Sequence, residues 1–472
     1  MSQQVFELGF NRPAKELAVE RLPVQGHIPD WLEGTLLRNG PGTFYAGEQR
    51  FRHWFDGLAM LHKFSFGGGQ VAYANKFLQS RTYQAVQAQG RIPYSEFATD
   101  PCRSLFERVT AVFTPQRTDN AKVSVTKMAD RFMALTETPI QVEFDPETLQ
   151  TVGVYQWEEN RLGQMTTVHP HFSADGQTAF NLVTRYGRVS HYRLYAQNGA
   201  GPARRLAAVS AAKPSYMHSF GMSANYFILT EFPLVVNPLS LLLRLRPYIE
   251  NFRWEPKRGT PFYVINRHSG ELVGRFEADP FFAFHHVNAF ERDGELVVDL
   301  VAYPDADIIQ AFYLNRLADR DLQLPFGEMR RFRLDLAGGR VRSETLADVC
   351  VELPVFDYRH YNTRADYRYV YAVSVDPARP YGFYNQLVKV DVSGGPTRTW
   401  AVAGGYPGEP VFVPRPQRQA EDDGVLLSVV LDAAAGHSFL LVLDAASLEE
   451  IGRAVIPEPV LFGYHGAYYT EV

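Results

Sequence analysis

Short, strongly apolar runs recur along the whole 472-residue chain and limit its possible folds more than any other feature. Val, Ile, Phe and Tyr favour strands, and a run that is apolar at nearly every position fits a strand buried on both faces. Asp-Gly between two such runs predicts a hairpin, because both residues tolerate a positive φ. The runs are 70–78, 131–138, 226–232, 295–303, 367–375, 424–431 and 438–444; the Asp-Gly pairs are Asp56-Gly57, Asp175-Gly176, Asp293-Gly294 and Asp423-Gly424.

Helical patterns are few, with candidates at 104–113 and 239–248. Many short strands with tight turns predict an all-β sandwich, barrel or propeller. A propeller is the most economical choice at this length, because six or seven four-stranded blades take up roughly 400 residues. The blades must have diverged, since no clear repeat recurs at a period of about 40 to 50 residues. The sequence has no linker or low-complexity tract, so we expect a single domain over residues 1–472.

Charge and cysteine content exclude several function classes. The formal net charge of −5 argues against nucleic acid as the main partner, because phosphate binding needs a basic surface. The two cysteines, Cys102 and Cys350, exclude a disulfide framework and CxxC zinc sites, which indicates a reducing cytoplasm. The first residues lack the pattern of a signal peptide. The most apolar segment, 234–245, is interrupted by Asn237, Pro238 and Arg244, so it is either buried core or an exposed patch that dips into one membrane leaflet.

Four of the 13 histidines lie in apolar, aromatic surroundings, whereas a surface or structural role is expected for most of the others. A buried imidazole must place both ring nitrogens. One interpretation is four separate core histidines, each bonded to the backbone; the other is convergence on one metal. The inner strands of propeller blades point to one axis, so ligands far apart in sequence can meet there. Imidazoles suit iron, copper, nickel and zinc. The four are His169, His218, His285 and His465.

Three glutamates, Glu137, Glu352 and Glu409, also lie in apolar β-like contexts, where Glu is rarely buried unpaired. Each either faces water at a strand end or accepts the second N–H of a metal-bound imidazole, which fixes the orientation of that ring. Four neutral imidazoles leave the two positive charges of a divalent metal uncompensated, so nearby carboxylates favour the metal interpretation. Motifs for other chemistries, such as GxSxG, HExxH and the P-loop, do not occur.

Longer motifs give the chain a specific resemblance. From about Pro29 to the C-terminus it closely resembles the carotenoid cleavage oxygenases, which include carotene oxygenases, the retinoid isomerohydrolase of the visual cycle and stilbene-cleaving dioxygenases. The first two are the most similar branch. The motifs are LEGTLLRNGPGTF (32–44), HWFDGLAMLHKF (53–64), TDNAKVSV (118–125), ALTETPIQVEFDPETL (134–149), KPSYMHSFGMSANY (213–226), FHHVNAFERDGELVVDL (284–300), GEPVFVPRP (408–416) and YHGAYY (464–469).

The resemblance implies a seven-bladed propeller with Fe(II) on its axis, under a cap of helices and loops. The metal ligands would be His169, His218, His285 and His465, supported by Glu137, Glu352 and Glu409. The neighbours His171 and His286 fall on positions that are not ligands. Residues 1–28 would form an N-terminal extension, and cap insertions would lie around 80–115 and 232–260. The chain departs from the usual pattern at Val168, where Ala is usual, and at Leu353, where Phe is common.

The activity implied is cleavage of a conjugated carbon–carbon double bond of a carotenoid or apocarotenoid by O2, giving two carbonyl products. A stilbene-cleaving dioxygenase, a polyene isomerase or isomerohydrolase, and a carotenoid-binding protein are the alternatives. Phe97, Thr136, Tyr216 and Tyr303 match positions near the metal and are expected to contact the substrate. The apolar membrane-facing segment of the family falls at 234–245, with Cys102 and the stretch 104–113 nearby. We therefore expect a cytoplasmic enzyme attached peripherally to membranes.

Overall fold

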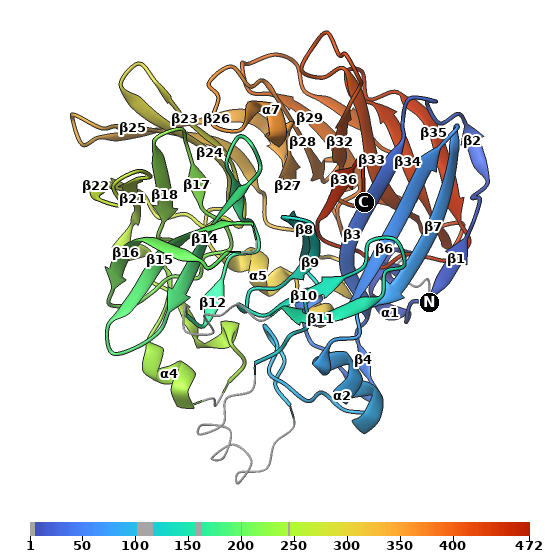
Figure 1. Ribbon diagram of the computed structural model, residues 1–472, viewed down its shortest axis with the longest axis horizontal. Coiled ribbons are helices and arrows are strands. Elements are labelled where there is room, and N and C mark those ends of the chain that lie inside the picture. Colours follow the sequence, from blue (N-terminus) through green and yellow to red (C-terminus); the bar gives the residue numbers. More distant parts are fainter. Residues whose placement is uncertain (1–4, 102–116, 156–162, 200, 244–245) are drawn as a thin grey trace.

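Seven antiparallel sheets surround a central axis in the computed structural model of this chain, which describes residues 5–101, 117–155, 163–199, 201–243 and 246–472. Each sheet forms one blade of a propeller (Figure 1). The predicted all-β propeller is therefore confirmed, with the seven blades that the family resemblance implies. Strands mostly pair with their neighbours in sequence, which is why local hairpin signals carry so much of the fold.

The strands of four blades, in sheet order, are as follows. The first contains β1 (Leu17–Val19), β7 (Gln70–Phe77), β6 (Leu58–Gly67), β3 (Gly34–Thr43) and β36 (Gly466–Tyr469). The second contains β11 (Thr151–Tyr155), β10 (Gln141–Phe144), β9 (Arg131–Leu135) and β8 (Ser124–Met128). The third contains β12 (Met165–Thr166), β14 (Thr178–Arg185), β15 (Ser190–Asn198) and β16 (Arg204–Ala211), with β13 (His171–Phe172) also on β14. The fourth contains β17 (Gly221–Met222), β18 (Tyr226–Thr230), β21 (Thr260–Asn266) and β22 (Leu272–Ala278).

Three further blades complete the ring, and two small hairpins lie outside it. The fifth blade contains β23 (His286–Arg292), β24 (Glu295–Ala302), β25 (Glu328–Asp335) and β26 (Val341–Cys350). The sixth contains β27 (Glu352–Val355), β28 (Tyr369–Ser374), β29 (Gln386–Asp391) and β30 (Arg398–Trp400). The seventh contains β2 (Val24–Gly26), β35 (Glu450–Ile456), β34 (His437–Asp444), β33 (Gly424–Asp432) and β31 (Gly405–Pro407), with β32 (Val411–Pro414) on β33. The hairpins are β4 (Tyr45–Ala46) with β5 (Gln49–Arg50), and β19 (Leu234–Val236) with β20 (Phe252–Trp254).

Two pairings between distant segments close the ring. β36, near the C-terminus, pairs antiparallel with β3, so that Arg38 lies opposite Gly466. β2 pairs with β35, with Gln25 opposite Arg453. Closure of this kind covers strand edges that would otherwise be free to pair with other chains. It also fixes the start of β36, the segment that carries His465, against the N-terminal part of the chain.

The predicted strands form, whereas two of the four predicted Asp-Gly turns differ from expectation. Each of the seven apolar runs contains a strand, and β24 and β33 are buried at nearly every position, as their continuous apolar sequences predict. Asp293-Gly294 forms a hairpin turn with φ of 54° and 81°, and Asp175-Gly176 turns between β13 and β14. The hairpin predicted at Asp56-Gly57 is wrong: the buried Asp56 ends a 3-10 turn, and its carboxylate accepts hydrogen bonds from Ala98 and Thr99. At Asp423-Gly424 a longer connection separates β32 from β33.

Short helices lie outside the blades. The helix expected at 239–248 begins as α4 at Pro238 and ends at Leu243, whereas the one expected at 104–113, like Cys102, lies outside the described residues. α2 was not predicted, although Ser80 Oγ accepts the Tyr83 N–H (3.1 Å) at its start and Gly90 ends it at φ +62°. α2 and α4 lie on the same side of the ring (Figure 1). The helices are α1 (Leu8–Asn11), α2 (Arg81–Gln89), α4 (Pro238–Leu243), α5 (Asp307–Ala311), α6 (Leu314–Leu317) and α7 (Tyr358–Tyr361).

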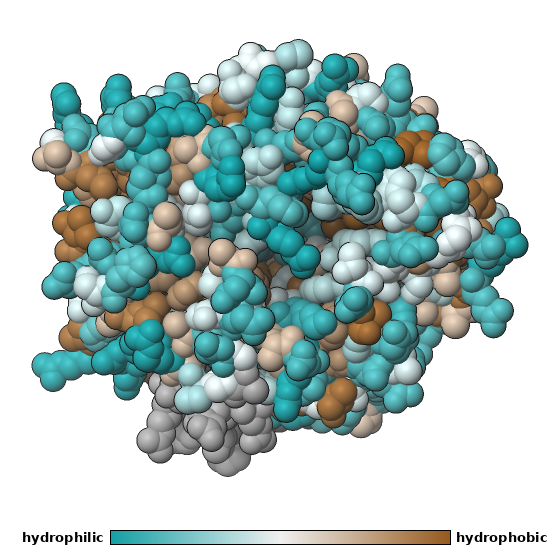
Figure 2. All heavy atoms as spheres, turned by 45° about the horizontal axis from the view of Figure 1, so that its top comes forward, coloured by the Kyte–Doolittle hydropathy of each residue, from teal (hydrophilic) through white to brown (hydrophobic). Residues whose placement is uncertain are grey.

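The outer surface and the interior differ as expected for a protein in water. The face seen in Figure 2 is mostly hydrophilic, with apolar residues dispersed over it. Between blades the packing is apolar, and Leu296, Val298 and Leu300 of β24 are fully buried. Within the described ranges, no helix combines the length and the apolar character needed to cross a membrane.

Candidate metal centre

The polar residues expected at the axis sit at the starts of the innermost strands. His218 precedes β17, His285 immediately precedes β23, and His465 immediately precedes β36. His169 lies between β12 and β13, which both pair with β14. Because each blade brings the start of its inner strand to the same end of the axis, residues separated by up to 296 positions meet there.

The four histidines form one cluster. Each offers a ring nitrogen, and these four atoms all lie within 4.8 Å of one another. The Nε2 atoms of His169 and His218 are 3.1 Å apart, and the ring of His169 lies 4.5 Å from that of His465 and 5.0 Å from that of His285, measured between centroids. His218, His285 and His465 are buried, and His169 is partly buried. The four histidines are therefore not separate core residues, because their ring nitrogens lie together.

Three carboxylates hold the other nitrogens of three of these rings. His218 Nδ1 lies 2.8 Å from Glu137 Oε1, and His465 Nδ1 lies 2.6 Å from Glu409 Oε1. His285 Nδ1 bonds to Glu352 Oε1. Each imidazole thus donates its Nδ1–H outwards and directs Nε2 to the cluster, which is the orientation a metal ligand needs. The pairing Glu137–His218, Glu352–His285 and Glu409–His465 could not be assigned from the sequence.

The pKa values of the buried site residues also favour metal binding by the histidines. Burial lowers the pKa of His285 to about 4, although Glu352 opposes the shift, and burial together with the neighbouring imidazoles lowers the pKa of His169 well below its usual value. For Glu352, burial raises the pKa, but His285, Tyr303 and the Leu353 N–H outweigh it and leave the pKa below its usual value. At neutral pH His169 and His285 are therefore neutral and Glu352 is ionised, the forms that bind a divalent metal.

One atom tests whether these residues fit a metal. His285 Nε2 is fully buried and has no hydrogen-bond partner among the described residues. An orphaned buried nitrogen costs free energy unless something binds it. The adjacent histidines are different: His286 bonds Ser219 and Thr230 through its two nitrogens, both at 2.8 Å, and His171 bonds Tyr358 and the Phe220 carbonyl, both at 2.8 Å. His171 and His286 are satisfied core histidines, whereas the four clustered rings present a donor set that fits a metal ion.

A cavity of about 830 Å³ opens onto this cluster. His218, His285 and His465 lie in its wall together with Phe97 and Thr136, two of the residues predicted to contact substrate. Aromatic and aliphatic side chains form much of the remaining wall, and residues of α4 contribute to it. A mainly apolar cavity of this size suits an elongated apolar ligand. The apolar wall includes Trp54, Phe55, Phe284, Phe312, Leu353 and Leu242.

Tyr216 and Tyr303 stand elsewhere than the sequence predicts. Neither lines the large cavity; both are fully buried behind it. Tyr216 Oη donates to Glu137 Oε1 at 2.6 Å, and Tyr303 Oη donates to Glu352 Oε2. Burial and the adjacent carboxylate raise the pKa of each phenol, so both remain protonated donors. In these positions both phenols support the carboxylates that orient His218 and His285, and their contact with substrate stays a prediction.

The two departures from the family pattern have different surroundings. Val168 packs against Met133 and Leu135 and does not line the cavity. Leu353 does line it, and its φ of 49° is in the left-handed region, which costs about 1–2 kcal/mol for a residue with a side chain. This conformation lets the Leu353 N–H donate to Glu352 Oε1 at 2.9 Å. The backbone strain thus helps to hold the carboxylate that orients His285.

Arg38 is a site residue that the sequence interpretation missed. It is buried, its Nη1 donates to the Glu409 carbonyl at 2.7 Å, and its Nη2 donates to the Tyr464 carbonyl at 3.3 Å. It therefore ties together the two segments that carry Glu409 and His465. An arginine inside the apolar run of β3 was the available signal, because Arg is almost never fully buried unless it is paired.

Buried histidines predict that the metal-free protein is unstable in acid. Burial lowers the pKa of His53, His62 and His286 to about 3 and of His171 to about 4, as for His285. Each of these histidines has a lower pKa in the folded protein than in the unfolded chain, where it is about 6.5. Its contribution to the free energy of unfolding is therefore complete above about pH 6.5 and is lost as the pH falls towards about 4. At pH 5 each buried histidine lowers the free energy of unfolding by roughly 2 kcal/mol, so the five together lower it by on the order of 10 kcal/mol.

Urea denaturation of metal-free protein at pH 7.5, 6 and 5 measures this loss. Asp56 opposes it only in part, because burial raises the pKa of its carboxyl to about 6 and so favours the folded state as the pH falls below 6. We expect a steep fall in the free energy of unfolding between pH 6.5 and 5. An unchanged midpoint at pH 5 would mean that these imidazoles are not buried as neutral groups.

Known proteins resemble this chain both in sequence and in fold. The sequence profile described as retinal pigment epithelial membrane protein matches residues 10–470. Carotenoid isomerooxygenase of Galleria mellonella is 37% identical over 94% of this chain and 92% of that protein, and β,β-carotene 15,15'-dioxygenase of Mus musculus is 32% identical over 98% and 92%. A Glu150Gln variant of Synechocystis apocarotenoid oxygenase superposes with a TM-score of 0.89 at 27% identity, covering 99% of both chains, and a cobalt-substituted form of that oxygenase has a TM-score of 0.87.

Proposed function

Since this chain belongs to the retinal pigment epithelial membrane protein family of carotenoid oxygenases, we propose that it is a non-haem iron(II) dioxygenase acting on a carotenoid or apocarotenoid. It cleaves one conjugated carbon–carbon double bond with O2 and releases two carbonyl fragments. The observation that carries this proposal is the convergence of four histidine nitrogens within 4.8 Å, at a mainly apolar cavity that three of these histidines line.

Iron is the proposed metal, and His169, His218, His285 and His465 are its proposed ligands. Neutral imidazoles suit several first-row metals, and the cobalt-substituted Synechocystis oxygenase indicates that related sites accept more than one ion. When bound, Fe(II) supplies the redox-active centre at which O2 reacts with the alkene. Metal analysis of protein purified without chelators, followed by reconstitution of metal-free protein with Fe(II), Zn(II) or Co(II), tests the choice. Only Fe(II) is expected to restore cleavage; equal activity with zinc would contradict it.

The protein's own contribution is positioning and shielding. Glu137, Glu352 and Glu409 accept the Nδ1–H of their histidines and so keep Nε2 directed inwards. The aromatic wall, with Phe55, Phe97 and others, holds an extended polyene so that one double bond lies beside the cluster. The same wall displaces water, which keeps reactive oxygen species away from bulk solvent. An alkene in this position needs no acid or base from the chain, which agrees with the lack of another catalytic motif.

Product analysis tests the reaction. Iron-loaded protein is incubated with carotenoids, apocarotenoids and stilbenes, and the products are identified by mass. We expect two carbonyl fragments from at least one polyene and no cleavage of stilbenes. A product of the same mass as the substrate would identify an isomerase, and tight binding without any product would identify a carrier.

Combined cleavage and isomerisation is a second candidate, which the Galleria mellonella relative favours because its name combines the two reactions. Cleavage followed by chromatographic separation of cis and trans fragments distinguishes it. An all-trans substrate that yields only all-trans fragments would exclude this candidate and leave simple cleavage.

Membrane attachment through the segment 234–245 is also proposed. β19 at the start of this segment is buried, but Leu239, Leu242 and Leu243 of α4 are 64%, 61% and 60% exposed. Leu239 and Leu242 also line the cavity, so the exposed leucines lie where a membrane-dissolved polyene would enter. Apolar side chains on a short helix beside such an opening suit insertion into one leaflet. Attachment would be peripheral and reversible.

Replacing the three exposed leucines of α4 by serine is expected to weaken liposome binding at least about 10-fold, because each loses apolar surface that the bilayer would bury. Sedimentation with phosphatidylcholine vesicles measures it. The matched control is Leu272→Ser with Val273→Ser, because these residues are 52% and 47% exposed on β22 and do not line the cavity. Equal binding by the α4 variant and the wild type would contradict attachment through this helix.

A further inference from the structure

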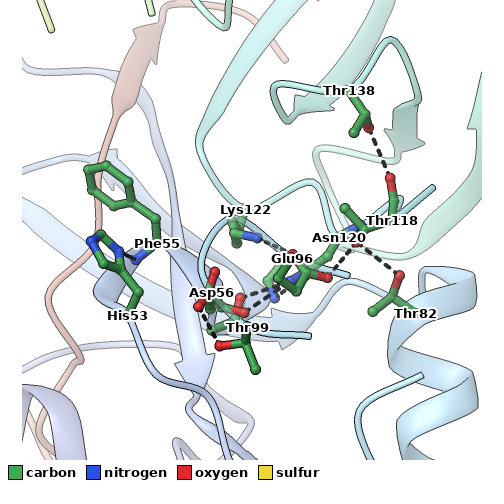
Figure 3. Close-up of polar contacts among 12 residues, drawn as sticks. His53, Phe55, Asp56, Thr82, Glu96, Thr99, Thr118, Asn120, Lys122 and Thr138 are labelled. Atoms are coloured by element: carbon green, nitrogen blue, oxygen red, sulfur yellow. Dashed lines mark hydrogen bonds and ion pairs between the residues drawn. The ribbon is translucent and has the colours of Figure 1, made fainter. Parts of the chain in front are cut away.

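A buried ion pair interrupts the apolar wall of the cavity. Lys122 Nζ lies 2.6 Å from Glu96 Oε2, and the side chains are 4% and 1% exposed. Both residues line the cavity that opens onto the histidines. Figure 3 shows the ammonium group of Lys122 pointing at Glu96, with Thr118 nearby. Arg188 and Arg246, two other charged residues of the lining, are exposed at the surface, whereas this pair is a deeply buried polar site in the cavity wall.

A network of hydrogen bonds fixes the pair in place. Thr118 Oγ1 donates to Glu96 Oε1 at 2.5 Å, and the Glu96 N–H donates to the Thr99 carbonyl at 2.8 Å. Thr138 Oγ1 donates to the Thr118 carbonyl at 2.9 Å, and the Lys122 N–H donates to the Asn120 carbonyl at 3.0 Å (Figure 3). Side chains held in this way lose little freedom when they bind a ligand, which is the arrangement of a preorganised site.

Lys122 occupies a special position on the propeller. It precedes the inner strand β8 by two residues, as Glu409 precedes β32, and His465 precedes β36 by one. The next residue, Val123, accepts the backbone N–H of His465 at 3.2 Å. On the second blade, Lys122 thus takes the place at the axis that metal-site residues take on other blades.

The energetics of the pair indicate a role beyond packing. Burying two charges costs several kcal/mol per ion, and apolar residues of similar volume would often be no less stable. Among the described residues, Glu96 is the one hydrogen-bond acceptor of Lys122 Nζ, although an ammonium group has three N–H donors. The Glu96 carboxylate also has lone pairs to spare, since a carboxylate has about four acceptor sites. The pair can therefore both donate to and accept from one further group.

We propose that Glu96 and Lys122 bind a hydroxyl group at one end of the polyene, so that the cavity selects a hydroxylated substrate. A hydroxyl matches both partners: its oxygen accepts from the Lys122 ammonium group and its O–H donates to the Glu96 carboxylate. A carbonyl end matches Lys122 alone, and a hydrocarbon end matches neither. This selection rests on the proposed function, because it assumes that a polyene occupies the cavity.

Binding measured apart from turnover tests the proposal. Trp54 lines the cavity, so quenching of tryptophan fluorescence reports a bound polyene. Kd is measured for three polyenes of equal chain length that end in a hydroxyl, an aldehyde or a plain hydrocarbon ring. We expect the hydroxylated polyene to bind about 10- to 100-fold more tightly than the hydrocarbon, as hydrogen bonds to charged groups allow, with the aldehyde between them. Equal Kd values for hydroxyl and hydrocarbon, or tightest binding of the aldehyde, would overturn the proposal.

The double variant Glu96→Gln with Lys122→Met removes both charges together, so neither is left buried and unpaired. We expect its hydroxyl-to-hydrocarbon preference to fall several-fold, because a neutral amide bonds a hydroxyl more weakly than a carboxylate and an ammonium group do, while hydrocarbon binding stays within a few-fold of the wild type. An undiminished preference would overturn the proposal. The matched control is Lys389→Met with Asp422→Asn, a pair at 2.5 Å with side chains 5% and 15% exposed that does not line the cavity.

The control variant should keep the preference, and its loss there would show that the effect is not local to the cavity and would overturn the proposal. If the double variant does not fold, the Kd ratio of the wild type still decides. Preferred binding of the hydroxylated polyene without cleavage would contradict the proposed function and leave this inference standing. Cleavage of both polyenes with equal Kd would support the proposed function and overturn this inference.

Discussion

Replacing His285 by alanine is expected to abolish metal binding and to lower polyene cleavage by more than about 100-fold. His285 Nε2 is buried, has no hydrogen-bond partner in the described part of the chain, and points into the cluster whose four nitrogens lie within 4.8 Å. Loss of a residue that only supports a ligand costs 10- to 100-fold in metal affinity or activity, so loss of the ligand itself must cost more. Metal content by mass spectrometry and product formation from an excess of polyene measure the two effects.

His286→Gln is the matched control, because His286 is the next residue and is also largely enclosed, although only partly buried. Its two nitrogens bond Ser219 and Thr230, so the variant should lose some stability and keep the metal. Full metal content and activity in His285→Ala would contradict the proposed site. Loss of the metal in His286→Gln, with retention in His285→Ala, would mean that the other histidine of the pair is the ligand.

Glu352→Gln is expected to weaken metal binding by about 10- to 100-fold. The carboxylate accepts hydrogen bonds from His285 Nδ1, Tyr303 Oη and the Leu353 N–H, so it is the most heavily bonded of the three glutamates. A neutral amide supplies no negative charge beside the metal, and it can turn an N–H towards His285 and so oppose the required tautomer. Competition for Fe(II) with a chelator of known affinity measures the change.

Glu231→Gln serves as the control for Glu352→Gln. Glu231 is also buried, but it does not line the cavity or contact the four histidines. Its variant should bind the metal with unchanged affinity, even if the fold is less stable. An equal loss of affinity in both variants would mean that the effect of Glu352→Gln is general destabilisation and not the loss of support for His285.

The blades were predictable because their signals are local. Continuous apolar runs such as 295–303 fit only strands covered on both faces, and Asp293-Gly294 fits a tight hairpin. Asp56-Gly57 has the same residue types but failed as a hairpin. Its aspartate is buried and bonded to Ala98 and Thr99, and such distant partners leave no local trace in the sequence.

The choice of four histidines was predictable from their apolar surroundings and from the family resemblance. The reason for choosing between neighbours appears only in three dimensions: His171 and His286 have both nitrogens occupied, whereas none of the described residues bonds His285 Nε2. The roles of Tyr216 and Tyr303 were not predictable, because a phenol that lines a cavity and one that supports a carboxylate behind it have similar sequence contexts. Nothing in the sequence around Lys122 distinguishes it from a surface lysine, because its burial beside Glu96 depends on the meeting of two loops.

Oxygen labelling tests the central claim most directly, namely that this chain uses its four-histidine site to split a conjugated double bond with O2. Iron-loaded protein is mixed with a cleavable polyene under 18O2, and the fragments are trapped within seconds, before their carbonyl oxygens exchange with water. We expect one 18O atom in each of the two carbonyl fragments. Fragments that carry oxygen from water, or a product that keeps the carbon chain intact, would contradict it.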